Sequence, residues 1–592
     1  MVVADEYSHR LRLRETEVAR LAKSHERIGN GRLALGAVIA LVAWGALFER
    51  AFAPAWLLIP VLAFVALLLY HSSVRRARVR AQRAVDYYRH GIARLEDRWP
   101  GSGQAGERFD ATHHIYAADL DLFGKGSLFQ LLCVARTRMG EDTLARWLLA
   151  PAVVATVKER HASIEDLRER LDLREEIAVL GEDDRVGVNP ESLLGWAEAP
   201  NELPAGWLLW LAFLLPALAI AGAVIWSVYG LLTPFVLIVL AEAGVTYLVR
   251  RAMSRSIQGT EQAFGDLKLF AGLLIRIERN TFTAVPLANL VRRLSSHSLP
   301  ASATINRLAR VIDFADARNN PFLRMLDTPL LYSVHVALAA ERWRRDHGKV
   351  IREWVDALGE FEALSSLAGY SYEHPQDPFP ELIEGPAGLR AIELGHPLIP
   401  AARCVRNSVS IESPTRVLLV SGSNMSGKST LLRTVGINTV LAMAGAPVRA
   451  RSLRLAPLQV GASIRVNDSL QEGSSRFYAE ITRLREIHGL LERELPLLFL
   501  LDELLQGTNS KDRLIGAEGI VRAFVAAGSI GLVSTHDLAL TDISGLAPGT
   551  LRNVHFQDEL RQGEMRFDFT LREGVVTKSN GIELMRAVGL KV

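Results

Sequence analysis

The stretch GSNMSGKST at residues 422–430 has residue types and a spacing that suit phosphate binding. Its first eight residues follow the pattern G-x-x-x-x-G-K-[ST], in which the glycines let backbone N–H groups converge on phosphate oxygens. Lys428 is expected to reach the β- and γ-phosphates, and the Ser429 hydroxyl to bind Mg²⁺. The stretch runs from an apolar segment into a helix-like one, whose N-terminal end adds positive charge. The residues predicted to bind the nucleotide here are Gly422, Ser423, Asn424, Met425, Ser426, Gly427, Lys428, Ser429 and Thr430.

A second group of chemically capable residues follows two later apolar runs. PLLFLLDE ends in Asp502 and Glu503, and GLVSTHD ends near His536. We expect Asp502 to hold Mg²⁺ together with Ser429, and Glu503 to orient or deprotonate the attacking water. His536 is a candidate γ-phosphate sensor. The alternatives are that the two acids simply end a strand and that His536 is an ordinary strand-end histidine. With Lys428, Glu503 and His536 in catalytic roles, the pattern predicts Mg²⁺-dependent ATP hydrolysis.

The elements that must position these residues alternate in type. The strand-like runs RVLLVSG, PLLFLLDE and IGLVSTHD are separated by helical segments, a pattern typical of a parallel α/β sheet. Such sheets bind ligands at the carboxyl ends of their strands. Upstream, apolar residues recur at helical spacing with charges on the opposite face, which predicts solvated helices. The proline- and glycine-rich stretch after Tyr370 is interpreted as a linker.

Two pairs of apolar runs interrupt the helical part. The first pair covers 33–48 and 51–70, with Glu49 and Arg50 between them, and the second covers 207–228 and 231–249. Their lengths are close to the ~20 residues that cross a bilayer, and basic residues flank the outer ends of the first pair. We predict two transmembrane hairpins whose ends stay in the cytoplasm, with Glu242 needing a partner or a shallow position. The alternative is that these segments are buried core helices.

Bulk composition narrows the class of protein further. The 592 residues allow several domains. Of these residues 49% are hydrophobic and the mean hydropathy is +0.15, so we expect the hydrophobic residues to be concentrated in discrete segments. A net charge of +3 is too small to indicate a nucleic-acid partner by itself. The two distant cysteines, Cys133 and Cys404, exclude a disulfide scaffold and a cysteine zinc site. The charged N-terminal stretch excludes a secretory signal.

Six segments occur in an order that resembles the ATPase domain of the MutS family of DNA mismatch repair. They are GHPLIP, GSNMSGKSTLLRTVGINTVLAMAGAPVRA, NDSLQEGSSRFYAEITRL, LLDELLQGTNSKD, STHDLALT and LREGVVTKSNGIELMRAVGL. Upstream, LFGKGSLFQLLCVARTRMGEDTLARWLLAPA is similar to the segment that opens the MutS core and lever region. The resemblance covers about 200 residues of the ATPase domain, with a looser match before it.

The resemblance implies further roles. GSSRFYAE corresponds to the family signature, in which a serine, here Ser475 with Ser474 beside it, meets the γ-phosphate held by the opposite subunit. This implies a homodimer through the ATPase domains, although ordinary helix capping by either serine is the alternative. Phe569 matches a position near the adenine, and a strand-core role is the alternative. Ser423 and Ser426 depart from the usual proline and glycine, and Cys404 stands near the usual base-stacking aromatic.

The resulting expectation is a multidomain protein. It has an α-helical MutS-like core and lever region with transmembrane hairpins, then a C-terminal α/β P-loop NTPase domain of the ABC-ATPase kind. The predicted boundaries are 1–105 for the first hairpin, 106–370 for the lever region, 371–387 for the linker and 388–592 for the ATPase. A mismatch-reading domain and a C-terminal nuclease are expected to be absent.

The function predicted is that of an ATP-switched dimer in the inner, cytoplasmic membrane, crossing it several times with the ATPase domain in the cytoplasm. Membrane lipid is a predicted partner, and DNA stays open as a client. One alternative is a mechanochemical or transport-associated membrane ATPase without DNA. The other is a soluble DNA-repair ATPase.

Overall fold

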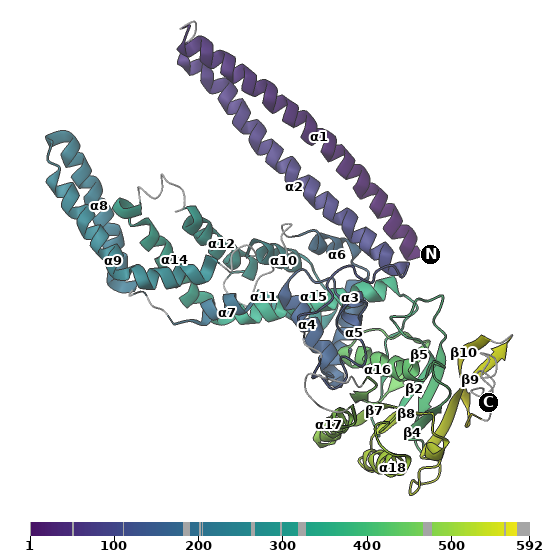
Figure 1. Ribbon diagram of the computed structural model, residues 1–592. Coiled ribbons are helices and arrows are strands. Elements are labelled where there is room, and N and C mark those ends of the chain that lie inside the picture. The colour runs from purple at the N-terminus through teal and green to yellow at the C-terminus, as the bar shows by residue number, and fades with distance from the viewer. Residues whose placement is uncertain are drawn as a thin grey trace.

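The structure is a computed structural model with a helical N-terminal part and a C-terminal part that contains two sheets (Figure 1). The residues that it describes are 2–49, 53–109, 112–180, 190–200, 203, 205–261, 267–295, 299–317, 327–465, 476–561 and 564–576.

The first hairpin is a pair of long antiparallel helices that projects from the body (Figure 1). It comprises α1 (Val2–Leu47), the short η1 (Pro54–Leu57) and α2 (Leu58–Leu95). The expected apolar runs are therefore the far ends of longer helices, because no proline interrupts α1 and the charged stretch before Leu33 continues the same helix. Arg50, half of the predicted turn, lies outside the described residues.

The middle of the chain is helical as expected, and the second hairpin extends from it. The helices before the hairpin are α3 (Leu128–Leu132), α4 (Arg138–Leu149), α5 (Val154–Arg168), α6 (Leu171–Ala178) and α7 (Pro190–Glu198). The hairpin is α8 (Ala205–Tyr229) with α9 (Thr233–Glu261). After it come α10 (Leu267–Arg279), α11 (Val285–Leu294), α12 (Ala301–Ala317), α14 (Tyr332–His347), η2 (Gly348–Val350) and α15 (Ile351–Glu373).

Within the described residues, four helices are long and apolar enough to cross a membrane, namely α1, η1 with α2, α8 and α9. Their apolar windows are only 11, 6, 28 and 11% buried, so most of this apolar surface packs against nothing in the described protein. The base of the second hairpin packs on α14, while Trp210 and Tyr229 are exposed. Glu242 of α9 is buried in the protein, and its two carboxylate oxygens have no hydrogen-bond partner among the described residues.

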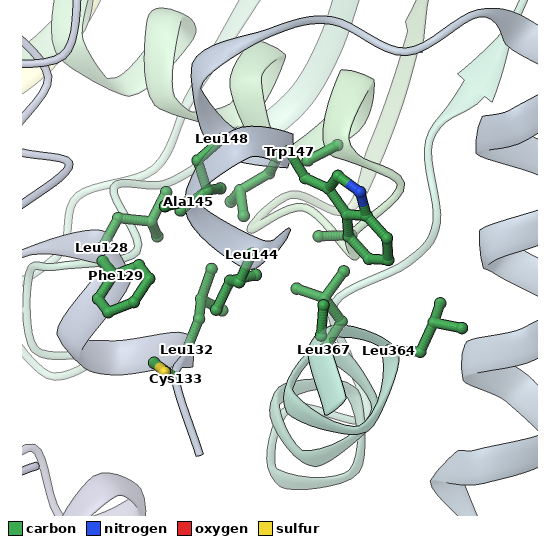
Figure 2. Packing of buried hydrophobic residues seen from close by; sticks show 14 of the residues in the cluster. Leu128, Phe129, Leu132, Cys133, Leu144, Ala145, Trp147, Leu148, Leu364 and Leu367 are labelled. Carbon is green, nitrogen blue, oxygen red and sulfur yellow. The ribbon is translucent and has the colours of Figure 1, made fainter. Parts of the chain in front are cut away.

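Helix α15 connects several helices of the helical part. It packs on α4, α5 and α11, and Figure 2 shows side chains of α3 and α4 meeting Leu364 and Leu367 of α15. The helix continues to Glu373, three residues into the stretch predicted as linker. The Glu373 carboxylate binds the Arg94 guanidinium at 2.6 and 2.7 Å, which fixes the end of α15 to the base of the first hairpin.

The C-terminal part has two sheets. The smaller has the order β1-β5-β2-β3, with β1 (Glu381–Leu382), β2 (Leu389–Leu394), β3 (Asn407–Ile411) and β5 (Ser452–Leu455). The larger has the order β10-β9-β4-β8-β7-β6. Its strands are β4 (Val417–Ser421), β6 (Gln459–Ser463), β7 (Leu497–Asp502), β8 (Ile530–Thr535), β9 (Leu551–Arg561) and β10 (Glu564–Glu573). The strands β9, β4, β8, β7 and β6 are parallel, and β10 is antiparallel to β9.

Helices cover both faces of the larger sheet. They are α16 (Lys428–Ala444), α17 (Arg476–Gly489) and α18 (Ser510–Ala526), with the short η3 (Leu490–Glu492) and η4 (Leu538–Thr541). Alternate residues of each strand face opposite sides of a sheet. Accordingly, Leu418 and Val420 pack with α16, whereas Val417 and Leu419 pack with α17 and α18.

The core on the α16 side continues without a break into the helical part. Helix α16 packs on α4 and α5, and Arg160 of α5 donates to the Ala444 carbonyl at 2.8 Å, at the end of α16. Buried Asp119 accepts hydrogen bonds from the N–H groups of Ile464 and Arg465, which follow β6. The helical part and the sheet are thereby joined by a single apolar core rather than by a flexible connection.

Candidate nucleotide site

The loop 422–427 between β4 and α16 is shaped by two glycines. Gly422 and Gly427 have φ angles of 149° and 109°, a region that favours glycine. A Cβ at Gly422 would lie 2.8 Å from the Ser426 hydroxyl oxygen, and one at Gly427 would lie 3.2 Å from the Phe569 ring. The loop is thus closely packed on both sides, and its backbone passes directly into the first turn of α16.

Lys428 is folded back onto its own loop. Its ammonium donates to the carbonyls of Gly422 and Ser423 at 2.9 and 2.8 Å, and it lies 3.8 Å from a carboxylate oxygen of Glu503. The residue is only 5% exposed. Burial lowers the pKa of the Lys428 ammonium, and the nearby carboxylates Glu503 and Asp502 oppose that shift.

The two acids lie at the carboxyl end of β7, beside the end of β8. Asp502 and Ser534 are paired in register, and the Ser534 hydroxyl donates to the Asp502 carboxylate. The N–H of Glu503 donates to both the carbonyl and the hydroxyl oxygen of Ser534 at 3.2 Å. Glu503 takes a φ of 51°, a left-handed conformation unusual for glutamate. The parallel pairing of β4, β8 and β7 brings these groups to the same edge as the loop.

His536 joins the same cluster. Its Nδ1 atom lies 3.5 Å from a Glu503 carboxylate oxygen, and its side chain is half exposed. The other Glu503 oxygen accepts from the Gln506 side chain. Glu503 therefore stands between Lys428, His536 and Gln506, with cations or donors around a single carboxylate.

Phe569 lies against the loop from the opposite side. Its backbone has a φ of 54° at an irregular point in the pairing of β10 with β9. Its carbonyl accepts from the Asn407 side chain at 2.9 Å, and Asn407 also accepts from the N–H of Leu571. The side chain is 42% exposed and next to Gly427, which is a loop-facing position and not the interior of a strand core.

Four other predicted residues lie at the loop tip and in the first turn of α16, and two lie outside the described residues. Met425 and Asn424 are exposed at the tip of the loop, and Ser429 and Thr430 lie in the first turn of α16. Ser474 and Ser475 lie outside the described residues. Helix α17 begins at Arg476, the residue that follows them in the sequence.

Three residues of this cluster were not among the sequence predictions, namely Ser534, Gln506 and Asn407. Ser534 stands two residues before His536, in the same GLVSTHD segment, so the motif itself contained the signal. Gln506 follows the two acids in LLDELLQG. Nothing in the sequence around Asn407 pointed to its contact with Phe569, because that contact joins segments 162 positions apart.

Residues 418–591, which begin within β4, match the family model of MutS domain V. The C-terminal part of this chain is MutS-related. The expected resemblance is thereby confirmed for the C-terminal part of the MutS-related chain, which holds the loop, both acids and His536.

Three curated proteins are similar to part of this chain. Endonuclease MutS2 of Thermus thermophilus is 36% identical over 262 residues, which are 42% of this MutS-related chain and 32% of the relative. DNA mismatch repair protein MutS 2 of Halobacterium salinarum is 32% identical, over 40% of this chain and 26% of its own length. DNA mismatch repair protein MutS of Brevibacillus brevis is 33% identical, over 39% of this chain and 26% of its own length. The similarity thus spans about a third or less of each relative.

Proposed function

We propose that this MutS-related chain is a membrane-anchored ATPase that hydrolyses ATP at the loop 422–427. The observation that carries the proposal is the convergence of Lys428, Glu503 and His536 at one edge of the parallel sheet, with both distances from Glu503 below 4 Å. An ammonium, a carboxylate and an imidazole beside a glycine loop and a helix N-terminus suit phosphoryl transfer to water.

The donor set of the loop fits a polyphosphate with a bound Mg²⁺. The hydroxyl oxygens of Ser423 and Ser426 are buried and have no hydrogen-bond partner among the described residues. The Lys428 ammonium donates hydrogen bonds to two loop carbonyls. A phosphate oxygen would replace these carbonyls as the acceptor. Asp502 and Ser429 offer the carboxylate and hydroxyl oxygens that Mg²⁺ prefers. Mg²⁺ held by them would neutralise charge that develops on the phosphates.

The residues of the chain then divide the work. Loop N–H groups and Lys428 bind and orient the triphosphate. Glu503 orients the attacking water and accepts its proton, and its fixed backbone, held by Ser534, aims the carboxylate. His536 is a donor that stabilises negative charge near the transferred phosphoryl group.

A dimeric site is part of the proposal. We infer that Ser475, with Ser474 before it in the sequence, meets the γ-phosphate held by a second copy of this chain. Support comes from the position of α17, which begins at Arg476, because the N-terminal end of a helix favours an anion. ATP binding would then close two ATPase domains, and hydrolysis would let them part.

Membrane anchoring by both hairpins is the second part of the proposal. The four apolar helices leave their apolar windows largely uncovered, which argues against core helices of a soluble protein. Both hairpins point away from the sheets toward the same side of the molecule (Figure 1), as insertion into one bilayer requires. Exposed Trp207, Trp226 and Tyr247 suit the bilayer interface. The ATPase domain would remain in the cytoplasm.

DNA is a second candidate partner because the names of two relatives include DNA mismatch repair. The alternative is a mechanochemical or transport-associated ATPase whose output is movement of the hairpins. The described membrane helices offer few polar groups for a transport path, with Glu242 the exception. Stimulation of ATP hydrolysis by duplex, mismatched or branched DNA would favour the first, and indifference to all three the second.

The proposed activity is tested with the full chain in detergent, with Mg²⁺. We expect Lys428→Ala to abolish ATP hydrolysis, and Glu503→Gln to keep ATP binding while lowering hydrolysis about 100-fold or more, because it removes the group that acts on water. Hydrolysis by Glu503→Gln at the parental rate would contradict the role assigned to Glu503.

Anchoring is tested separately by fractionation of cell membranes. An integral protein stays with the membranes in high salt and requires detergent for release. Release by salt alone would contradict the hairpin assignment and favour the soluble DNA-repair alternative.

A further inference from the structure

A cavity of about 430 Å³ lies where three parts of the chain meet. One wall is the first turn of α1 with Leu95 of α2, and a second is the end of α15 with the residues that follow it to Asp377. The third wall belongs to the C-terminal part and includes Arg406 and Arg449. We name it the junction cavity. Its volume is within the range of small-molecule sites, and it is separate from the loop 422–427.

Arg449 is the feature of this cavity that points to a ligand. The residue is only 5% exposed, and its Nε has no hydrogen-bond partner among the described residues. A buried guanidinium nitrogen without a partner is costly. Arg406 supplies a second cation on the same wall, and α1 turns the positive end of a 46-residue helix toward the cavity. The one acidic residue in that first turn is Asp5.

Two acidic residues line the cavity as well, and both are held by other groups. Glu373 is paired with Arg94 and accepts from the Tyr7 hydroxyl at 3.2 Å. Asp377 accepts from the Tyr370 hydroxyl at 3.2 Å, and burial raises the pKa of its carboxyl against the opposing effect of His374, Arg449 and Arg406. Neither acid makes an ion pair with Arg449 or Arg406, so the two guanidiniums remain available to an anion.

We propose that the junction cavity binds a small, soluble phosphate monoester, with Arg449 and Arg406 on the phosphate and the apolar wall of Val3, Leu95 and Pro375 against its organic body. Arginine pairs bind phosphate in a bidentate manner, and helix N-terminal N–H groups add to that preference. The ligand would join the hairpin base, the lever and the ATPase domain, so its presence would stiffen the connection between nucleotide site and membrane.

A soluble ligand is favoured over a lipid headgroup because of the length of α1. The apolar run begins at Leu33, and the 31 residues from Val2 to Arg32 extend about 45 Å along a helix that rises ~1.5 Å per residue. The junction cavity is at the opposite end of that segment from the membrane. A headgroup in the bilayer surface would not reach it.

The probe for the test is phenyl phosphate, titrated by calorimetry into the full chain in detergent. The chain carries Lys428→Ala, so that the loop 422–427 contributes no phosphate binding. We expect saturable binding, and a loss of affinity of about 10-fold or more in the additional variant Arg449→Gln, since a charged hydrogen-bond partner is removed. Arg406→Gln serves as a second variant, with the same expected direction, should Arg449→Gln fail to fold.

Arg451→Gln is the matched control, since Arg451 is two residues from Arg449 and its side chain is 72% exposed. It should leave phenyl phosphate binding unchanged. Absence of saturable binding, or equal affinity in the parent and both arginine variants, would overturn the proposal. Vesicles containing phosphatidic acid form the second arm, in which we expect no competition with phenyl phosphate. Competition that depends on Arg449 would overturn the assignment to a soluble ligand.

Discussion

Ser534 connects the two acids of the nucleotide site through a single hydroxyl. It donates to Asp502 and accepts from the N–H of Glu503, so it holds the metal-binding acid and the water-orienting acid in a fixed relation. This hydroxyl is a positioning group, because nothing places it against the substrate. Its removal should therefore affect turnover more than ATP affinity.

We expect Ser534→Ala to lower kcat about 10-fold while the affinity for ATP changes less than about 3-fold, since Glu503 keeps its charge but loses its fixed orientation. Steady-state hydrolysis and nucleotide binding, measured on the same preparation, separate the two quantities. Ser529→Ala is the control, because Ser529 is also buried near β8 and its hydroxyl has no partner among the described residues. Equal effects of the two variants would contradict the positioning role.

The sequence predicted which side chains would gather at this edge, but not how they are held. Lys428, Asp502, Glu503 and His536 each follow a strand or a glycine loop, and parallel strands end at one edge. The contact of Lys428 with its own loop carbonyls depends on how the loop folds back, and the bond from Ser534 to Asp502 depends on the register of β7 with β8. Motif spacing contains no information on either.

Among the elements, the contact of α4 with α15 depends on a buried carboxylate. Glu362 of α15 is 1% exposed and accepts from the N–H of Arg136 and from the hydroxyl of Thr137, the residue that caps α4. Burial raises the pKa of Glu362 to about 7, against an ordinary value of 4.5, and the hydrogen bonds only reduce that shift. The folded chain thus binds this proton more tightly than the unfolded chain does.

The consequence is a defined pH dependence. The contribution of Glu362 to stability is complete below a pH of about 4.5 and is lost as the pH rises through about 7, a change of roughly 3 kcal/mol. We expect Glu362→Gln to flatten this dependence, because glutamine does not ionise. Its amide oxygen can still accept from the Arg136 N–H, and its amide nitrogen can donate to the Thr137 hydroxyl oxygen instead of accepting from it. Hydrogen exchange of the α4 and α15 amides at about pH 5.5 and about pH 8, corrected for intrinsic rates, measures how the stability of these two helices changes with pH.

Glu360→Gln is the control for this element. Glu360 lies on the same helix, is 41% exposed and pairs with Arg293. Its replacement should leave the pH dependence of α4 and α15 intact. A parental pH dependence in Glu362→Gln would show that another group is responsible.

The elements themselves were only partly predictable. Helical periodicity and apolar runs correctly indicated helices in both hairpins, but not that α1 is continuous from Val2 to Leu47. A charged amphipathic segment and an apolar one have different patterns, and only the lack of a proline between them indicates continuity. Likewise, α15 extends to Glu373 because a distant partner, Arg94, holds its last turn.

At the scale of the whole molecule, the central proposal is a nucleotide site shared by two copies. In a symmetric dimer each site would combine the loop of one copy with Ser475 of the other. Lys428→Ala disables the site that uses the loop of the mutated copy, and Ser475→Arg disables the site that uses the loop of the other copy. In a dimer of one Lys428→Ala copy and one Ser475→Arg copy, both changes fall on the same site, so the second site stays intact.

We expect each variant alone to be inactive and an equal mixture to regain about a quarter of the parental ATPase rate, because half of the dimers are mixed and each has one intact site. When the two variants are co-expressed with different affinity tags and the mixed dimer is purified, the expected ATPase rate rises to about half of the parental rate. No recovery in the purified mixed dimer would rule out the shared site.

The unbroken core between α16 and the helices α4 and α5 also governs how the ATPase region behaves when it is cut from the rest. Val440 and Leu441 of α16 belong to the same buried cluster as Leu144 and Leu148 of α4. A fragment starting at the predicted boundary, residue 388, would expose that apolar face to water and is expected to aggregate. Proteolysis at the exposed residues 384–386 should accordingly leave the two pieces associated. The smallest unit with intact chemistry should retain the segment from about Trp99 onward, and because that segment includes the second hairpin, it should still require detergent.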